Sequence, residues 1–271
     1  MQRLLVTGSS GGMGRLLRER LARPGRVLRL LDLAHPDDVV ASPDLELRTG
    51  SVTDPAVVAR ALDGADAVLH LAGISVEGPW PDVLDVNVHG TWCVLDAASR
   101  TGARVLLASS NHAVGMLARA DAGPQGVPAD APPRPDTYYG WSKTAGESLG
   151  RMYADRTGLD VVALRIGSCF AVPTNVRALS TWLSPDDAAR LVEACLAAPS
   201  PGFRTVWGIS RNTRRWFSLA EGEALGYHPL DDAERFAADV LARAEPDEVL
   251  DLVGGGFTEY VLGTTSRPPR P

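Results

Sequence analysis

The sequence predicts an α/β protein: a Rossmann-type, doubly wound parallel sheet followed by a small C-terminal region. Three observations predict this fold. Short apolar runs alternate with helical stretches through the N-terminal half, the runs are apolar throughout instead of at every second residue, and a glycine-rich turn follows the first run. Strands that are covered by helices on both faces give this pattern. We expect a core over residues 1–167 and a second region over 168–271 that returns one strand, near 205–209, to the sheet.

The elements follow one another along the chain in this alternation. The first half is predicted to contain strand 3–7, helix 13–22, strand 26–31, strand 45–48, helix 55–62, strand 67–71, helix 82–100 and strand 104–108. Asp54 is the expected N-cap of helix 55–62, because Pro55 suits the first helical position. Prolines make 120–135 a loop. The second half is predicted to contain helix 139–157, strand 160–165, helix 185–198, strand 205–209 and helix 231–243.

The composition excludes several classes of protein. The formal net charge of -6 argues against a nucleic acid or an anionic membrane as the main partner. No apolar run approaches the roughly 18 residues that cross a bilayer, and no signal segment precedes the first strand, so we expect a cytoplasmic protein. Cys93, Cys169 and Cys195 are far apart, and they predict neither a disulfide framework nor a metal site.

A glycine-rich turn lies between the first predicted strand and helix, with Gly8, Gly11 and Gly14 three residues apart. Glycines at this spacing permit a tight turn, the approach of a pyrophosphate, and close packing of helix on strand. The helix N-terminus also offers free N–H groups to phosphate. Asp32 ends the second strand, where a carboxylate can bind ribose hydroxyls and repel a 2′-phosphate. The sequence therefore predicts a site for NAD rather than NADP; a structural turn and a loop-capping aspartate are the alternatives.

Tyr139 and Lys143 are four residues apart on a predicted helix, and Lys143 is the only lysine in the chain. Residues at this spacing share a helix face. A nearby ammonium lowers the pKa of a phenol, so we expect Tyr139 to act as a general base. Residues 109–112 follow a predicted strand, at the edge of a parallel sheet where ligands bind, and a serine hydroxyl there can hydrogen-bond the reacting oxygen beside Tyr139. Capping by the serines and a structural role for His112 are the alternatives.

Together these motifs resemble the extended branch of the short-chain dehydrogenase/reductase superfamily. The resemblance is carried by the glycine-rich turn, the tyrosine–lysine pair, the serine pair, Asn87 and segment 70–73 (HLAG). Further segments resemble the uronate dehydrogenases more specifically, and this resemblance runs over essentially the whole chain: 73–77 (GISVE), 108–112 (ASSNH), 165–169 (RIGSC), 179–182 (LSTW) and 206–208 (VWG).

The resemblance implies NAD-dependent oxidation of D-galacturonate and D-glucuronate at C1 to aldarolactones, with the C-terminal region binding the substrate. It implies Tyr139 as the base, Lys143 as its activator and Ser110 as a further catalytic contact. The implied substrate contacts are Ser75, Ser110, Asn111, His112, Tyr139, Ser168 and Arg177. The implied cofactor contacts are Gly8, Ser10, Gly11, Gly12, Met13, Gly14, Asp32, Leu71, Ala72, Gly73, Ser109, Tyr139, Lys143 and Ile166. Superfamily members usually associate, so we expect a homo-oligomer.

The role of Arg177 also has a chemical reason, because a guanidinium pairs with a carboxylate in a fork; a solvated loop arginine is the alternative. The sequence departs from the family pattern at Ser51-Val52, where relatives often have an acid near the adenine, and at 170–174, near the substrate. A sugar-nucleotide epimerase or dehydratase remains an alternative function, although the short C-terminal region favours a small substrate. A non-catalytic NAD sensor is another, although it would not need the tyrosine–lysine pair.

Overall fold

The computed structural model describes residues 1–244 and 250–267. Its centre is a seven-stranded sheet in which every neighbouring pair is parallel. The strands, in their order across the sheet, are β3 (Leu45–Thr49), β2 (Arg26–Asp32), β1 (Gln2–Thr7), β4 (Ala67–His70), β5 (Arg104–Ser110), β6 (Val161–Ile166) and β9 (Phe203–Gly208). The predicted fold class is confirmed. The strand expected near 205–209 is β9, which pairs with β6 at one edge of the sheet.

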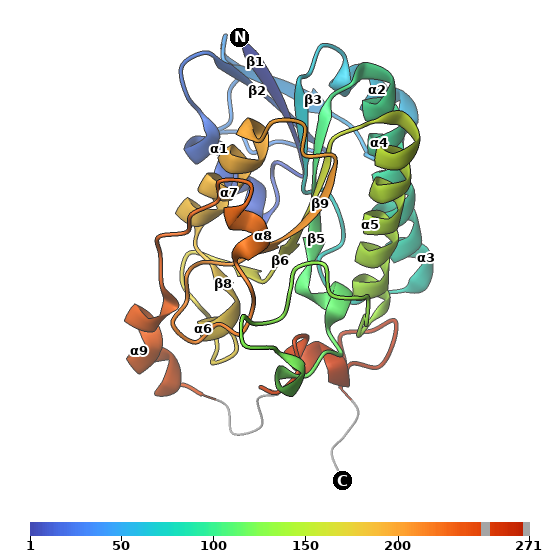
Figure 1. Ribbon diagram of the computed structural model, residues 1–271. Helices are drawn as coiled ribbons and strands as arrows, with labels where there is room; N and C mark the ends of the chain where they lie inside the picture. Colours follow the sequence, from blue (N-terminus) through green and yellow to red (C-terminus); the bar gives the residue numbers. More distant parts are fainter. Residues whose placement is uncertain (245–249, 268–271) are drawn as a thin grey trace.

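Helices cover both faces of the sheet (Figure 1). One face carries α1 (Gly12–Leu21) and α7 (Pro185–Ala197), which pack against each other, and the other carries α2 (Pro55–Leu62), α4 (Gly90–Thr101) and α5 (Tyr138–Thr157). Asp54 caps α2 as expected, since its Oδ1 accepts hydrogen bonds from two backbone amides of the first turn.

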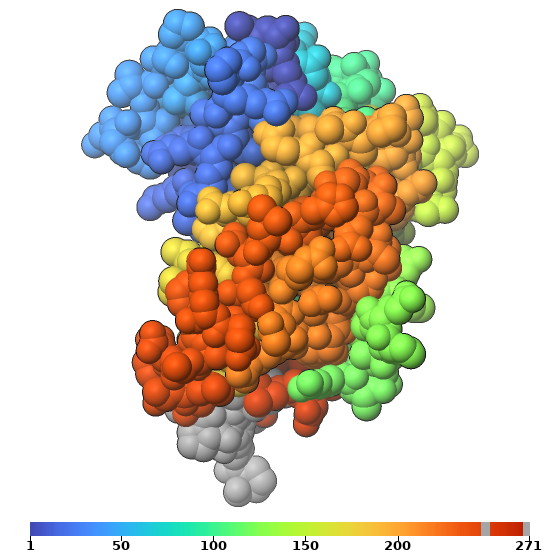
Figure 2. Space-filling view, turned by 60° about the vertical axis from the view of Figure 1, so that its left-hand side comes forward, coloured from blue at the N-terminus to red at the C-terminus, as the bar shows by residue number. Residues whose placement is uncertain are grey.

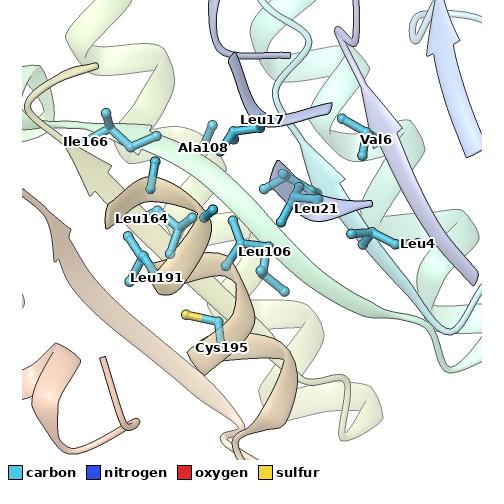
Figure 3. Close-up of a cluster of buried hydrophobic side chains, with 14 of the residues drawn as sticks. Leu4, Val6, Leu17, Leu21, Leu106, Ala108, Leu164, Ile166, Leu191 and Cys195 are labelled. Atoms are coloured by element: carbon cyan, nitrogen blue, oxygen red, sulfur yellow. The ribbon is translucent and has the colours of Figure 1, made fainter. Parts of the chain in front are cut away.

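Alternate residues of each strand supply the two halves of the core. Leu4 and Val6 of β1 pack with Leu17 and Leu21 of α1 on one face (Figure 3), whereas Leu5 packs into the cluster on the other face. Successive side chains of a strand point to opposite faces. Because both faces are dry, both sets must be apolar, and this explains the continuous apolar runs in the sequence.

The long helix predicted over 82–100 is present, but a π-helical turn that was not predicted interrupts its α-helical geometry. The structure has a short α3 (Trp80–Val83), then a wide π-helical turn over Leu84–His89, and then α4. The turn directs Asn87 inward, where its amide bonds both backbone groups of Ile74 and the hydroxyl of Ser142. Such turns are rare and are often found at functional sites. The apolar spacing could not reveal it, because the contacts that favour it come from distant segments.

Several other elements differ in extent from the predictions. Strand β5 continues through Ser110 instead of ending at 108. The helix predicted over 231–243 is a 3₁₀ turn (Ala233–Phe236) followed by a short α9 (Ala237–Leu241). The loop over 120–135 is irregular, apart from the end of a 3₁₀ turn (Arg119–Asp121). Within the described ranges no helix is long and apolar enough to span a membrane.

The remaining elements gather beyond the carboxyl ends of the strands, in the lower part of Figure 1. They include the paired two-residue strands β7 (Ser168–Cys169) and β8 (Trp182–Leu183), helix α6 (Ala178–Thr181), and a 3₁₀ turn (Gly255–Glu259). Helix α8 (Ala220–Glu223) lies apart from them, beside β9. In Figure 2 the orange and red later segments cover the lower part of the visible face, below the blue N-terminal strands. This arrangement places the C-terminal segments beside the edge where a parallel sheet binds ligands.

Candidate active site

A cavity of about 630 Å³ lies at this carboxyl edge. Its walls come from the glycine-rich turn, the ends of β4, β5 and β6, helix α5, the segment after β7, and the C-terminal 3₁₀ turn. It brings together most of the predicted site residues: Gly8, Gly11, Gly12, Met13, Gly14, Leu71, Gly73, Ser75, Ser109, Ser110, His112, Tyr139, Lys143, Ile166, Ser168 and Arg177. Ser10, Asp32, Ala72 and Asn111 are not among the described residues that line it.

A larger hollow of about 810 Å³ lies elsewhere, at the amino-terminal end of β9. Its lining includes Arg151, Phe203 and Glu221 but none of the predicted site residues. We place the candidate site in the smaller cavity, because the predicted tyrosine, lysine and histidine converge there and none of the predicted site residues lines the larger hollow.

The glycine-rich turn has the shape that a dinucleotide requires. Gly8 has a positive φ of 68°, and a side chain there would collide with the backbone of Ala72. A Cβ on Gly14 would lie 2.5 Å from the carbonyl oxygen of Gly8, whereas a Cβ on Gly12 would meet nothing within 4 Å. Helix α1 begins here without a side-chain cap, so its first N–H groups remain available to an anion. The residues present therefore fit the pyrophosphate of NAD.

Asp32 lies at the end of β2, next to this turn. Its carboxylate accepts hydrogen bonds from the backbone amides of Ser10 (2.8 Å) and Leu33 (2.7 Å). The nearby Ser9 hydroxyl is buried and has no hydrogen-bond partner within residues 1–244 and 250–267. A carboxylate held in this position is compatible with ribose hydroxyls and unfavourable for a 2′-phosphate.

Tyr139 and Lys143 lie on one face of α5 and line the cavity, as predicted. The Lys143 Nζ is 5.5 Å from the centroid of the Tyr139 ring and donates a hydrogen bond to the carbonyl of Ala108 (3.0 Å). Burial lowers the pKa of Lys143 to about 8. Burial also raises the pKa of Tyr139 to about 12, although a hydrogen bond with Ser110 acts in the opposite direction. The sequence predicted a lowered pKa for Tyr139. In the protein without cofactor, the pKa is raised instead, because desolvation outweighs the hydrogen bond with Ser110.

His112 is held from several sides. Its Nδ1 lies 2.6 Å from Oδ2 of Asp136, its ring stacks on Phe257 at a centroid distance of 4.0 Å, and it meets the Tyr139 ring edge-on at 5.6 Å. Burial lowers the pKa of His112, even though the hydrogen bond to Asp136 favours the charged form. A neutral imidazole therefore faces the cavity next to the tyrosine.

Arg177 and Asn111 meet at one backbone carbonyl of the C-terminal segment. The Nε and Nη2 atoms of Arg177 donate to the carbonyl of Val253 at 2.9 and 2.6 Å, and the Asn111 amide donates to the same oxygen at 3.0 Å. Arg177 lines the cavity, and the Oδ1 of Asn111 is buried without a partner in the described part of the chain. These contacts join two predicted substrate residues to a segment far away in the sequence.

Three predicted serines at the cavity differ in how strongly other parts of the protein already bind them. Ser75 is exposed at the cavity wall, and the Ser168 hydroxyl lies 2.6 Å from that of Thr181. Ser109 donates to Oε1 of Glu147 at 2.5 Å, and Glu147 forms a buried two-pronged ion pair with Arg165. Ser109 is therefore bound by the protein itself, although it borders the cavity.

Three residues of the site were missed from the sequence: Asp136, Glu147 and Phe257. Glu147 follows Lys143 by four residues, so the helical spacing that revealed the pair could have revealed it too. Asp136 stands just before Thr137, the N-cap of α5, where an acidic residue suggests only a helix start. Phe257 has no local signal, because it reaches the cavity through the folding back of the C-terminal segment.

Comparisons with known proteins agree with this geometry. Residues 4–217 match the model of the NAD dependent epimerase/dehydratase family. The chain is 40% identical over 259 residues to a uronate dehydrogenase of Pseudomonas syringae pv. tomato, covering 94% of this chain and 92% of that one. It is 37% identical over 254 residues to an NAD-dependent glucose-6-phosphate dehydrogenase of Haloferax volcanii, covering 87% of this chain and 95% of that one.

Among solved structures, the crystal structure of an Agrobacterium tumefaciens uronate dehydrogenase superposes with a TM-score of 0.90 at 38% identity. It covers 97% of this chain and 98% of that one, and it is a tyrosine-to-alanine mutant complexed with NAD. The chain therefore belongs to the NAD dependent epimerase/dehydratase family of the extended short-chain dehydrogenase/reductase type. Within it, the chain is a member of the uronate dehydrogenase family, and NAD is its cofactor.

Proposed function

We propose that this enzyme oxidises D-galacturonate and D-glucuronate at C1 with NAD and produces aldarolactones. The convergence of Tyr139, Ser110, His112 and Arg177 on one cavity next to the glycine-rich turn is the observation that carries the proposal. The cavity offers a base for a hydroxyl and a cation for a carboxylate, and a hexuronate has both groups. The similarity to uronate dehydrogenases over almost the whole chain supports the same substrate class.

Tyr139 takes the proton of the C1 hydroxyl, and the hydrogen bond with Ser110 stabilises the phenolate that must form first. When bound, NAD supplies the hydride acceptor and a positive charge, and the turn from Gly8 to Gly14 and Asp32 would hold it. Burial and the negative charge of Asp136 raise the pKa of Tyr139. The positive charge of the bound nicotinamide, together with the Lys143 ammonium, would act against them and favour the phenolate. Lys143, held on the carbonyl of Ala108, would bind the nicotinamide ribose hydroxyls.

Arg177 would bind the substrate carboxylate, because it lines the cavity and a guanidinium pairs with a carboxylate in a fork. Ser75, Asn111, His112 and Ser168 would hold the sugar hydroxyls. We assign residues 1–167 to the cofactor core and 168–271 to the substrate region. Association into a homo-oligomer and a cytoplasmic location stay predictions, which light scattering and cell fractionation test.

The test is an assay of NADH formation with galacturonate, glucuronate and glucose 6-phosphate, each with NAD and with NADP. Product analysis after incubation with a UDP-sugar accompanies it, because an epimerase or dehydratase regenerates NAD and forms no net NADH. We expect the two uronates to react with NAD at the highest kcat/KM. A preference for glucose 6-phosphate would overturn the substrate class, conversion of the UDP-sugar would favour an epimerase or dehydratase, and a preference for NADP would overturn the role of Asp32.

A further inference from the structure

Asp136 is a carboxylate with no access to solvent, next to the candidate active site. Its side chain is 0% exposed. Oδ2 lies 2.6 Å from Nδ1 of His112, and Oδ1 accepts a hydrogen bond from the hydroxyl of Thr137 at 2.8 Å. A buried carboxylate is costly unless hydrogen bonds satisfy it, so both of its oxygens are committed to these two side chains.

Glycines from three segments surround this carboxylate. A Cβ on Gly115 or on Gly254 would lie 2.0 Å from Oδ2 of Asp136, and a Cβ on Gly140 would lie 2.7 Å from Oδ1. None of these glycines has a positive φ, so the backbone conformation does not require glycine at them. At Gly115 and Gly254 the Asp136 carboxylate is the nearest obstacle to a side chain, whereas at Gly140 the carbonyl oxygen of His112, at 2.4 Å, is nearer still. The chain therefore leaves room for Asp136 from three directions, which a simple helix cap would not need.

The ring of His112 has one polar atom left for the cavity. Nδ1 is occupied by Asp136 and one ring face by Phe257, whereas Nε2 has no hydrogen bond to any described residue, and the ring lines the cavity. An ionised carboxylate accepts but does not donate, so it keeps the proton of a neutral imidazole on Nδ1. Nε2 then carries a lone pair. The charged and titratable groups around the ring are Asp136, Arg177 and Tyr139, and burial favours the neutral form.

We propose that Asp136 is a positioning residue that fixes the tautomer of His112, so that Nε2 accepts a hydrogen bond from a hydroxyl of the substrate. This inference rests on the proposed function, and it identifies the imidazole of His112 as the group that binds one sugar hydroxyl. The two cations that line the cavity, the Arg177 guanidinium and the Lys143 ammonium, are donors without an acceptor lone pair. An acceptor beside Tyr139 binds O–H and disfavours a carboxylate. It therefore turns the hydroxyl-bearing carbons toward the base and the carboxylate toward Arg177.

The first experiment measures the tautomer directly. We would record the ¹⁵N chemical shifts of the histidine rings in the wild-type protein at neutral pH and assign His112 from a His112→Gln variant. The expected result is a protonated Nδ1 and an unprotonated Nε2 in the wild type. In Asp136→Asn and Asp136→Ala, we expect the proton to populate Nε2. A wild-type ring protonated on Nε2 would overturn the inference without any need for a folded variant.

The second experiment measures the consequence for the substrate. In Asp136→Asn we expect kcat/KM for uronate to fall on the order of tenfold or more, mainly through KM, with the Kd for NAD and the Tm close to wild type. The matched control is Asp54→Asn, the same change at the start of α2, where asparagine caps equally well; it should leave KM unchanged.

The outcomes separate the two proposals. If the wild type oxidises no uronate, the proposed function fails, while the ¹⁵N shifts still decide whether Asp136 sets the tautomer. If uronate is oxidised and both Asp136 variants keep the wild-type tautomer and KM, the positioning role is wrong. If the Asp136 variants also lose affinity for NAD and have a lower Tm than the wild type, Asp136 only supports the fold.

Discussion

Lys143, the only lysine of the chain, is partly buried at the cavity and has no carboxylate partner among the described residues. Burying an ammonium without an opposite charge costs stability, and this cost appears as a pKa of about 8 in place of 10.5. The ammonium therefore lies at this place at a cost in stability. Its position, four residues from Tyr139 and 3.6 Å from a Cβ built on Gly73, is at the site of the proposed chemistry.

This leads to a pH-dependent prediction for Lys143→Met. The folded state binds the lysine proton more weakly than the unfolded state, so the wild type is penalised fully below pH 8, and the penalty disappears as the pH rises toward 10.5. The variant should therefore have a higher Tm than wild type at pH 7, and the difference should shrink toward pH 10. Thermal unfolding across this range measures it. A difference that grows with pH would contradict the burial argument.

Tyr139→Phe tests the proton acceptor. The change removes only the phenolic oxygen, which accepts the proton of the C1 hydroxyl in the proposed reaction. The contact between the ring and His112 can persist. We expect turnover to be abolished while the Kd for NAD, followed by fluorescence titration, stays within about threefold of wild type. Substantial turnover by this variant would remove Tyr139 from the role of base.

At the scale of an element, the glycine-rich turn combines two tasks that single substitutions can separate. Gly14→Ala places a Cβ 2.5 Å from two backbone carbonyl oxygens, so we expect a lower Tm of the protein without cofactor. Gly12→Ala meets no protein atom within 4 Å but enters the cavity, so we expect an unchanged Tm and weaker NAD binding. Thermal unfolding and NAD titration of both variants test this. If both variants changed the Tm and the Kd for NAD to a similar extent, the two tasks of the turn would not be separate.

The elements show why sequence patterns predicted some features and not others. Strand β1, the turn after it and α1 were predicted because apolar runs, glycines and helix starts are local signals. The π-helical turn at Asn87 was not, because its inward amide bonds Ile74 and Ser142, which no local pattern couples to it. The spacing of Tyr139 and Lys143 survived in the structure because both lie within one helix.

At the scale of the whole molecule, the site is completed by the last part of the chain. Phe257 stacks on His112, and Val253 accepts from both Asn111 and Arg177. No motif marks either residue, because each reaches the cavity only when the C-terminal segment folds back over the sheet edge. The sequence could therefore predict the cofactor side of the site more completely than the substrate side.

Arg177→Ala tests this assembly. If Arg177 binds the substrate carboxylate, its loss should raise KM for a uronate by roughly 10- to 150-fold, since a hydrogen bond to a charged group contributes about 1.5–3 kcal/mol. The Kd for NAD should not change. A KM equal to that of the wild type would remove Arg177 from the substrate site and leave it as a structural contact of Val253.

The most direct test of the central claim is the initial rate of NADH formation from galacturonate and glucuronate with the purified protein. We predict rapid NADH formation with NAD, a strong preference for NAD over NADP, and an aldarolactone as the product identified by NMR. No NADH from either uronate, in a preparation that binds NAD, would contradict the proposed function.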